Sequence, residues 1–227
     1  MPRTLRALRR PLLALALLAA TLPPAGCRAA REEYYKALEK VGIEKRDLLV
    51  RRVDKAKEAQ QEAQEQFKDA LEEFQALVGY QGGDLEAMYE KLSGEYEASV
   101  ARAEEVRERV RKVEEVAQSL FEEWKREIGQ YGDAELRRES ERQLEATRAR
   151  YGQLVQVMKR STQPMEPVLG KLHDQVLFLK HNLNARALGS LAGTAKNLEA
   201  DVDALIAQMQ GSIAEADRFI AEMKAGR

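Results

Sequence analysis

Residues 85–131 read LEAMYEKLSGEYEASVARAEEVRERVRKVEEVAQSLFEEWKREIGQY. Apolar and small residues recur in this stretch at alternating steps of four and three, which is the spacing of a heptad seam. As an α-helix the stretch is about 70 Å long at 1.5 Å per residue. A heptad phase held over that length predicts left-handed supercoiling against other helices rather than packing in a compact globule. The predicted seam residues are Leu85, Met88, Leu92, Tyr96, Ser99, Ala103, Val106, Val110, Val113, Ala117, Leu120, Trp124, Ile128 and Tyr131.

Glycine followed by aspartate marks both ends of this helix. Gly79-Tyr80-Gln81-Gly82-Gly83-Asp84 precedes it and Gly132-Asp133 follows it. Glycine adopts the left-handed conformation that closes a helix, and aspartate accepts hydrogen bonds from the free N–H groups at the start of the next one. The pattern predicts a preceding helix over residues 44–78 and a following helix from residue 134, both antiparallel to the long helix.

Two prolines interrupt the heptad pattern after residue 160. The stretch Ser161-Thr162-Gln163-Pro164-Met165-Glu166-Pro167 predicts a kink or a brief break, because proline removes a helical hydrogen bond and clashes with the preceding turn. Helix then resumes to about residue 183. Within it, Val176-Leu177-Phe178-Leu179 is apolar on every side, so we expect it to form the densest part of the core.

The end of the chain allows two arrangements. Asn184 can cap a separate helix over residues 185–224, or one continuous helix can run over residues 164–224. We favour the turn, because it produces four helices of comparable length. The predicted fold is all-α: an elongated antiparallel helical bundle or coiled coil of three to four long helices over residues 44–227.

The charge balance argues against one class of partner. The chain has 37 Lys and Arg and 38 Asp and Glu, and residues 1–26 contain four arginines and no acid. The remaining chain therefore carries 33 basic and 38 acidic residues, a formal charge of −5. A mildly acidic protein is poorly suited to neutralising phosphates, so we expect no nucleic-acid partner.

The N-terminus has the pattern of an export signal. A basic segment, residues 1–10, precedes an apolar run over residues 11–20, which is too short to span a bilayer but suits a signal-peptide core. Pro24-Ala25-Gly26-Cys27 follows and resembles the bacterial lipobox, in which the cysteine receives diacylglycerol before cleavage. Pro24 departs from that pattern, where leucine is usual.

The resemblance to the lipobox implies a place in the cell. Residues 1–26 are then the signal peptide, residues 27–43 a tether and short helix, and Cys27 the anchor in the membrane. Two or three acyl chains anchor a protein stably. Arg28 after the cysteine favours the periplasmic face of the outer membrane by resemblance to sorting signals. The alternative is a plain signal peptide with an incidental cysteine.

Candidate chemistry is sparse in this sequence. The two histidines, His173 and His181, are eight residues apart and about 80° apart around a helix, too oblique to converge on one ion. No Gly-x-Ser-x-Gly elbow or phosphate-binding glycine loop occurs. We therefore expect neither an enzyme nor a cofactor, and we interpret the many Glu pairs as a solvated face.

Several motifs resemble an uncharacterised proteobacterial family, a domain of unknown function whose members are often described as lipoproteins. The resemblance implies an exported helical protein, and it implies no activity or site residues. The motifs are Tyr34-Tyr35, Glu39-Lys40-Val41-Gly42, Lys45-Arg46-Asp47, Gly82-Gly83-Asp84-Leu85, Met165-Glu166-Pro167-Val168-Leu169 and residues 174–185, DQVLFLKHNLNA.

Two functional hypotheses follow. The first is a non-catalytic, lipid-anchored periplasmic bundle that acts as a scaffold, spacer or adaptor in the cell envelope. Its far tip would contact a protein partner through Tyr80, Gln81, His181, Asn182 and Asn184. The alternative is a coiled-coil module that forms homo-oligomers on a membrane surface, in envelope stress or membrane maintenance.

Overall fold

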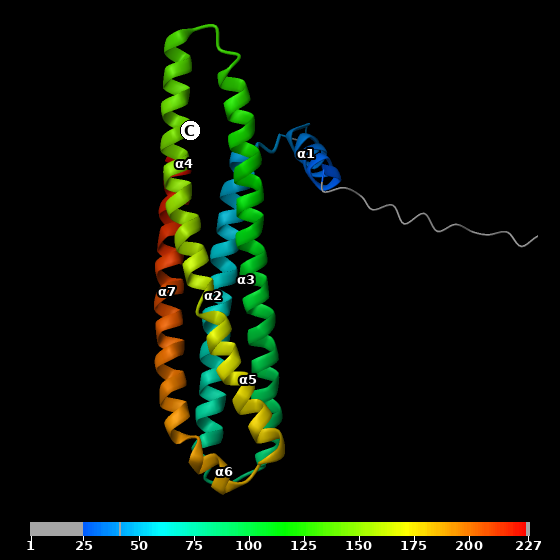
Figure 1. Cartoon of the computed structure of the whole chain (residues 1–227), viewed down its shortest axis with the longest axis vertical. Coiled ribbons are helices and arrows are strands. Elements are labelled where there is room, and N and C mark those ends of the chain that lie inside the picture. Colours follow the sequence, from blue (N-terminus) through cyan, green and yellow to red (C-terminus); the bar gives the residue numbers. More distant parts are fainter. Residues whose placement is uncertain (1–24, 41, 226–227) are drawn as a thin grey trace, which may run out of the picture.

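The protein is a long helical bundle (Figure 1). A computed structural model describes residues 25–40 and 42–225, and all regular structure in these ranges is α-helical. The predicted all-α bundle of long antiparallel helices is confirmed. The helices are α1 (Ala25–Lys40), α2 (Lys45–Val78), α3 (Leu85–Ile128), α4 (Ala134–Thr162), α5 (Met165–His181), α6 (Ala185–Ser190) and α7 (Ala192–Ala225).

Helix α2 lies at the centre of the packing. It packs along α3 on one side and along α7 on the other, and its core residues, from Leu49 to Leu77, are fully buried. Helix α4 packs on α3 and α7 in the upper half of Figure 1, and α5 takes the same place in the lower half. At each level of the bundle, up to four helices, α2 among them, therefore surround one apolar core.

The helix ends lie close to the predicted positions. Asp84 accepts a hydrogen bond from the Ala87 N–H at the start of α3, and Asp133 accepts from the N–H groups of Glu135 and Leu136 at the start of α4. These backbone donors also lower the pKa of Asp133. The prediction that the long helix extends to residue 131 was wrong by three residues, because the helix ends at Ile128 before Gly129, and Tyr131 is exposed.

The helix is interrupted at the proline-containing stretch, as the sequence predicts. Helix α4 ends at Thr162 and α5 begins at Met165, with Pro164 between them. The predicted turn after His181 is also present, so residues 164–224 are not one helix. The single helix predicted over residues 185–224 was wrong, because a turn at Leu191 divides it into α6 and α7.

The N-terminal segment differs from the prediction in its structure. Residues 28–31, which we expected to be part of a tether, are helical. The helix is held beside α3, where Glu32 accepts a 2.8 Å hydrogen bond from the Ser119 hydroxyl. Figure 1 shows α1 set back from the α3–α4 turn, which extends beyond it, so α1 does not lie at the very end of the bundle.

A polar layer crosses the core near the α4–α5 break. Gln60 of α2, Ser161 of α4 and Ser212 of α7 are all fully buried. The Gln60 amide donates to the Ser161 hydroxyl at 3.2 Å, and that hydroxyl donates to the carbonyl oxygen of Met158 at 2.7 Å. Gln60 Oε1 and the Ser212 hydroxyl have no hydrogen-bond partner among the described residues. The layer therefore combines one satisfied chain of hydrogen bonds with two unsatisfied oxygen atoms.

Substitutions of Ser212 and Ser161 should have opposite effects on the free energy of unfolding. Ser212→Ala removes a buried hydroxyl without a partner, so we expect the free energy of unfolding to rise by about 1 kcal/mol. Ser161→Ala leaves the Gln60 amide unpaired, so we expect a fall of about 1–3 kcal/mol. Urea unfolding with an unchanged slope measures both values. A loss of stability in Ser212→Ala would mean that the hydroxyl has a partner, such as a buried water.

Candidate functional site

The sequence places the predicted contact residues in two connections, and the fold brings both to the same end of the bundle. The α2–α3 loop, residues 79–84, and the α5–α6 turn, residues 182–184, lie together at the lower end in Figure 1. Helix α6 also contacts α2 there. We call this end, with the last turns of α5, the distal tip.

Glycine and a tyrosine shape the α2–α3 loop. Gly82 and Gly83 have φ angles of 132° and 126°, which side-chain-bearing residues rarely adopt. The Tyr80 hydroxyl donates a 2.9 Å hydrogen bond to the carbonyl oxygen of Gly83 and so closes the loop on itself. Gln81 is exposed between them. The loop is a compact turn that presents Gln81 to solvent.

Two asparagines hold the α5–α6 turn. The Asn182 amide donates to the carbonyl oxygen of Phe178 at 2.9 Å, at the end of α5. Asn184 accepts from the Ala187 N–H at 3.1 Å and caps α6. His181 is exposed. Of the five predicted contact residues, Tyr80, Asn182 and Asn184 therefore stabilise the turns, whereas the side chains of Gln81 and His181 make no hydrogen bond among the described residues.

The apolar run of α5 is where the structure departs most from the prediction. Val176 and Leu179 are buried, but Leu177 is 51% exposed and Phe178 is 39% exposed. The run was predicted to be the densest core, and that prediction was wrong. Helices α3 and α7 cover α5 on its inner side only, so the residues on its outer side have no neighbouring helix.

These two residues stand out among the exposed side chains. The exposed large hydrophobic residues of the described chain are Tyr34, Tyr131, Leu136, Leu177 and Phe178. Leu177 and Phe178 are the adjacent pair, and they lie within one turn of His181 on the same helix. Single exposed apolar residues are ordinary, but an adjacent pair at a helix surface favours a contact site.

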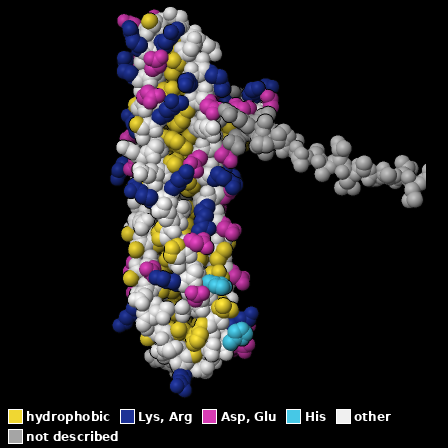
Figure 2. All heavy atoms as spheres, in the orientation of Figure 1, with side chains coloured by type: hydrophobic (Ala, Val, Ile, Leu, Met, Phe, Trp, Pro, Cys, Tyr) yellow, Lys and Arg dark blue, Asp and Glu magenta, His cyan; other side chains and the backbone are white. Residues whose placement is uncertain are grey.

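A shallow groove lies next to this pair along α5. It has a volume of about 300 Å³. The rings of Tyr96 and His173 are 5.6 Å apart at its wall, and Arg107 of α3 pairs with Glu166 of α5 at 2.8 Å. Figure 2 shows hydrophobic side chains and both histidines on this lower part of the visible face. The remaining lining residues are Val100, Glu104, Leu169 and Gly170.

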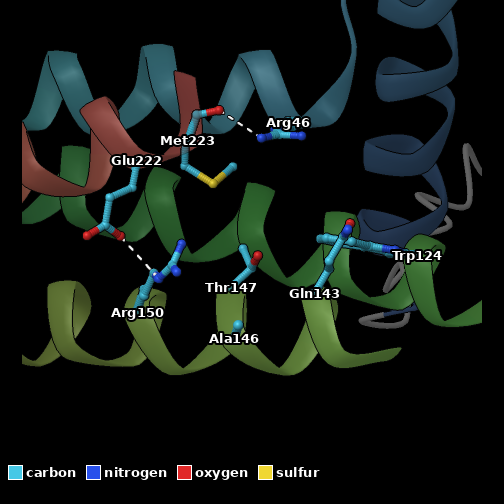
Figure 3. A pocket seen from close by; sticks show the side chains of 8 residues that line it. All are labelled: Arg46, Trp124, Gln143, Ala146, Thr147, Arg150, Glu222 and Met223. Atoms are coloured by element: carbon cyan, nitrogen blue, oxygen red, sulfur yellow. Dashed lines mark hydrogen bonds and ion pairs between the residues drawn. The ribbon is translucent and has the colours of Figure 1, made fainter. Parts of the chain in front are cut away.

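The opposite end of the bundle carries a second groove, which the sequence did not predict (Figure 3). Its volume is about 240 Å³, and it lies where α2 begins and α7 ends. The Arg46 guanidinium donates to the carbonyl oxygen of Met223 at 2.8 Å, and Arg150 pairs with Glu222 at 3.2 Å. The charged groups of this groove therefore connect helices. Trp124, the single tryptophan, was the one sequence feature that could have indicated this end.

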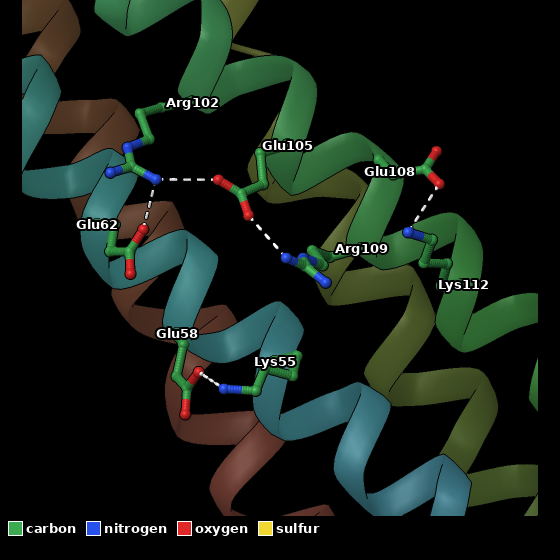
Figure 4. Close-up of polar contacts among 8 residues, drawn as sticks. All are labelled: Lys55, Glu58, Glu62, Arg102, Glu105, Glu108, Arg109 and Lys112. Atoms are coloured by element: carbon green, nitrogen blue, oxygen red, sulfur yellow. Dashed lines mark hydrogen bonds and ion pairs between the residues drawn. The ribbon is translucent and has the colours of Figure 1, made fainter.

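The charged surface consists largely of ion pairs within and between helices. In Figure 4, Arg102 bridges to Glu62 of α2 and to Glu105 of α3, and Arg109 also pairs with Glu105. The hydrogen bond from Arg109 and the contact with Arg102 lower the pKa of Glu105. Burial raises the pKa of Tyr151 to about 12, with a smaller contribution from Glu114. These shifts have local causes and do not converge on a cavity.

No group of three or more His, Cys, Asp or Glu side chains among the described residues is arranged to hold a metal ion.

None of the helices in the described ranges combines the length and the apolar character needed to cross a membrane. The predicted signal peptide lies almost entirely in residues 1–24, outside the described ranges, and Cys27 lies in the first turn of α1.

Comparison with known proteins identifies one match. The model of a family described as "Protein of unknown function (DUF2959)" matches residues 34–223. Neither the curated proteins nor the solved structures include a match to this chain.

The stability of variants at the exposed Leu177 and Phe178 can be compared with that of a variant at the buried Leu179. Leu177→Ser and Phe178→Ser remove side chains that are only partly buried, so we expect the free energy of unfolding to fall by about 1 kcal/mol. Leu179→Ser, one residue further and fully buried, should lower it by about 2–5 kcal/mol. Chemical denaturation of the three variants measures the difference. Equal losses at all three positions would mean that Leu177 and Phe178 are buried in solution.

Proposed function

The chain belongs to this family of proteins of unknown function, DUF2959, and we propose that it is a lipid-anchored adaptor of the cell envelope. In this proposal Cys27 carries the lipid, the bundle faces the periplasm at the outer membrane, and the distal tip binds a protein partner. The bundle serves as a rigid spacer between the two. Catalysis has no part in the proposal.

One observation carries the proposal: the adjacent exposed pair Leu177 and Phe178 beside a tip whose turns are internally braced. Hydrogen bonds from Tyr80 and Asn182, together with the Asn184 cap, hold the two connections in one conformation. A surface that is already ordered loses little conformational entropy on binding. An apolar pair with polar neighbours, Gln81 and His181, matches the apolar centre and polar rim of protein interfaces.

The long body supports a spacer role. Helix α3 has 44 residues, which corresponds to about 66 Å at 1.5 Å per residue. Interhelical ion pairs and hydrogen bonds connect α2 to its neighbours along this length, from Lys45–Glu123 near one end to Lys91–Glu73 near the other. A body connected in this way resists bending, so the tip is held at a set distance from α1.

The anchor is tested separately from the contact. Cys27→Ala should abolish incorporation of radiolabelled palmitate and shift the protein from the membrane fraction to the soluble periplasmic fraction. Efficient processing despite Pro24 is part of this expectation. Labelling that persists in Cys27→Ala, or is absent from the unaltered chain, would contradict the anchor.

The contact is tested by crosslinking in cells with a matched control. Leu177→Ser with Phe178→Ser should eliminate a crosslinked partner that the unaltered chain recovers, because the apolar centre of the contact is removed. Leu136→Ser is the control, since Leu136 is 57% exposed in α4, at the opposite end of the bundle. Recovery that is unchanged in the double variant, or lost equally in both variants, would contradict binding at the distal tip.

A further inference from the structure

The α3–α4 hairpin projects beyond the rest of the bundle (Figure 1). We call residues 124–148 the hairpin end. Ser119, which holds α1 through Glu32, lies nine residues before the end of α3 at Ile128, or about 14 Å at 1.5 Å per residue. Cys27 lies only five residues before Glu32 on α1. A membrane that receives a lipid from Cys27 is therefore within reach of the hairpin end.

Large apolar side chains are exposed at the hairpin end. Leu136 of α4 is 57% exposed, and Tyr131 in the α3–α4 turn is 39% exposed. Tyr34 of α1, which is 48% exposed, is a third such residue in the same half of the bundle. Tyrosine and leucine next to basic residues are characteristic of surfaces that lie at the level of lipid headgroups. The apolar residues of the hairpin end therefore fit a membrane surface.

The hairpin end also carries cations without a partner. Lys125, Arg126 and Arg138 are exposed and form no ion pair among the described residues. Arg137 donates a 2.7 Å hydrogen bond to the carbonyl oxygen of Tyr131, a contact that leaves its charge uncompensated. These four cations are available to a phosphate group.

Most acids of the hairpin end are engaged within the chain. Asp133 accepts two backbone hydrogen bonds at the start of α4, and Glu139 and Glu145 each pair with an arginine of the same helix. Glu135 and Glu141 are exposed and form no ion pair in the part of the chain that the structure describes. Unpaired cations therefore outnumber unpaired acids at this end.

A groove between α3 and α4 brings the apolar and basic features together. Its volume is about 540 Å³, larger than that of either groove described above. Ile128 and Leu144, both buried, contribute apolar surface, and Lys125, Arg137 and Arg148 line the groove with positive charge. Apolar surface beside cations fits an anionic amphiphile, whose acyl carbons contact the apolar residues while its phosphate contacts the cations. The remaining lining residues are Gly129, Glu141 and Glu145.

The net charge differs between the two halves of the bundle. The buried polar layer of Gln60, Ser161 and Ser212 separates the half with α1 and the hairpin end from the half with the distal tip. The first half has 25 Lys and Arg and 23 Asp and Glu, a formal charge of +2, and the second has 7 and 15, a formal charge of −8. An anionic surface therefore attracts the hairpin end and repels the distal tip. The first half consists of residues 25–60, 104–161 and 212–225, and the second of residues 61–103 and 162–211.

We propose that the hairpin end binds the surface of an anionic membrane. Tyr131 and Leu136 enter the headgroup layer, and the groove between α3 and α4 holds the phosphate and the upper acyl chain of one lipid. The proposal deepens the proposed function and rests on it only for the membrane to which Cys27 is attached, because this contact needs no acyl chain on the protein. Attachment at two places restricts tilting of the bundle, so the distal tip is directed away from the membrane.

Vesicle binding by the chain carrying Cys27→Ala tests the contact without the anchor. About half of the chain should co-sediment with phosphatidylcholine vesicles that contain phosphatidylglycerol at about 1 mM anionic lipid, and less with pure phosphatidylcholine. Tyr131→Ser with Leu136→Ser should lower the partition coefficient about tenfold. Leu177→Ser with Phe178→Ser, at the other end, is the matched control and should leave it unchanged. No binding to the anionic vesicles would overturn the proposal and leave the Cys27 anchor untouched.

Opposite changes of charge in the groove test the headgroup site. Lys125→Gln removes an unpaired cation and should lower the partition coefficient on anionic vesicles about fivefold, whereas Glu141→Gln removes an unpaired acid and should raise it by a similar factor. Misfolding does not explain tighter binding. Lys68→Gln, at an exposed lysine in the other half of α2 without an ion pair among the described residues, is the control. Shifts of the same sign at Lys125 and Glu141, or an equal loss at Lys68, would contradict the site.

Two exposed glutamines in opposite turns test the orientation. The chain with Cys27→Ala has no other cysteine, so Gln130→Cys and Gln81→Cys each accept one environment-sensitive fluorophore. Anionic vesicles should shift the emission to shorter wavelength at position 130 only. Equal shifts at both positions, or a shift at position 81 alone, would overturn binding through the hairpin end. A dimer in sedimentation equilibrium that Leu136→Ser converts to a monomer would assign this surface to a second copy instead of lipid.

Discussion

The buried seam of α2 is the constraint on which the rest of the structure depends. It combines alanines, such as Ala56 and Ala63, with large rings, such as Phe67 and Phe74, and all four are fully buried. Such a seam needs neighbours on two sides to exclude water, and α3 and α7 supply them. The remaining helices fill the sides of this three-helix unit that still expose apolar surface.

The break at Pro164 lets one side be covered by two helices in succession. Helix α4 ends at Thr162, one residue after the buried Ser161, and α5 continues in its place. The buried polar layer of Gln60 and Ser161 lies next to this break, where a purely apolar core would allow the helices to slide. Polar groups in a core favour one register at a cost in stability. The layer therefore explains how a broken helix keeps a defined alignment with α2.

The same break has consequences at the surface. Since α5 is one of the four helices around the core and is covered on its inner side only, its apolar run cannot be buried on every side, and Leu177 and Phe178 remain exposed. The polar residues of the distal tip, in contrast, mostly form hydrogen bonds that stabilise the turns. The exposed apolar residues of α5 therefore lie on an ordered helix face, and the loops of the distal tip are held by their own hydrogen bonds.

The helices and most of their ends could be predicted from local sequence signals. Gly79, Asp84, Pro164 and Asn184 act through backbone geometry and local hydrogen bonds, which depend on residues only a few positions away. The sequence also placed Tyr80, Gln81 and His181 at one end, because short connections force neighbouring helices to be antiparallel.

Which apolar residues are covered depends on how the helices pack together. The exposure of Leu177 depends on the number of helices around α5, and the exposure of Tyr131 and Leu136 depends on α3 and α4 continuing past the ends of their neighbours. The attachment of α1 to α3 includes a hydrogen bond between Ser119 and Glu32, which are far apart in the chain. Burial and distant contacts are properties of the assembled bundle, and no local pattern encodes them.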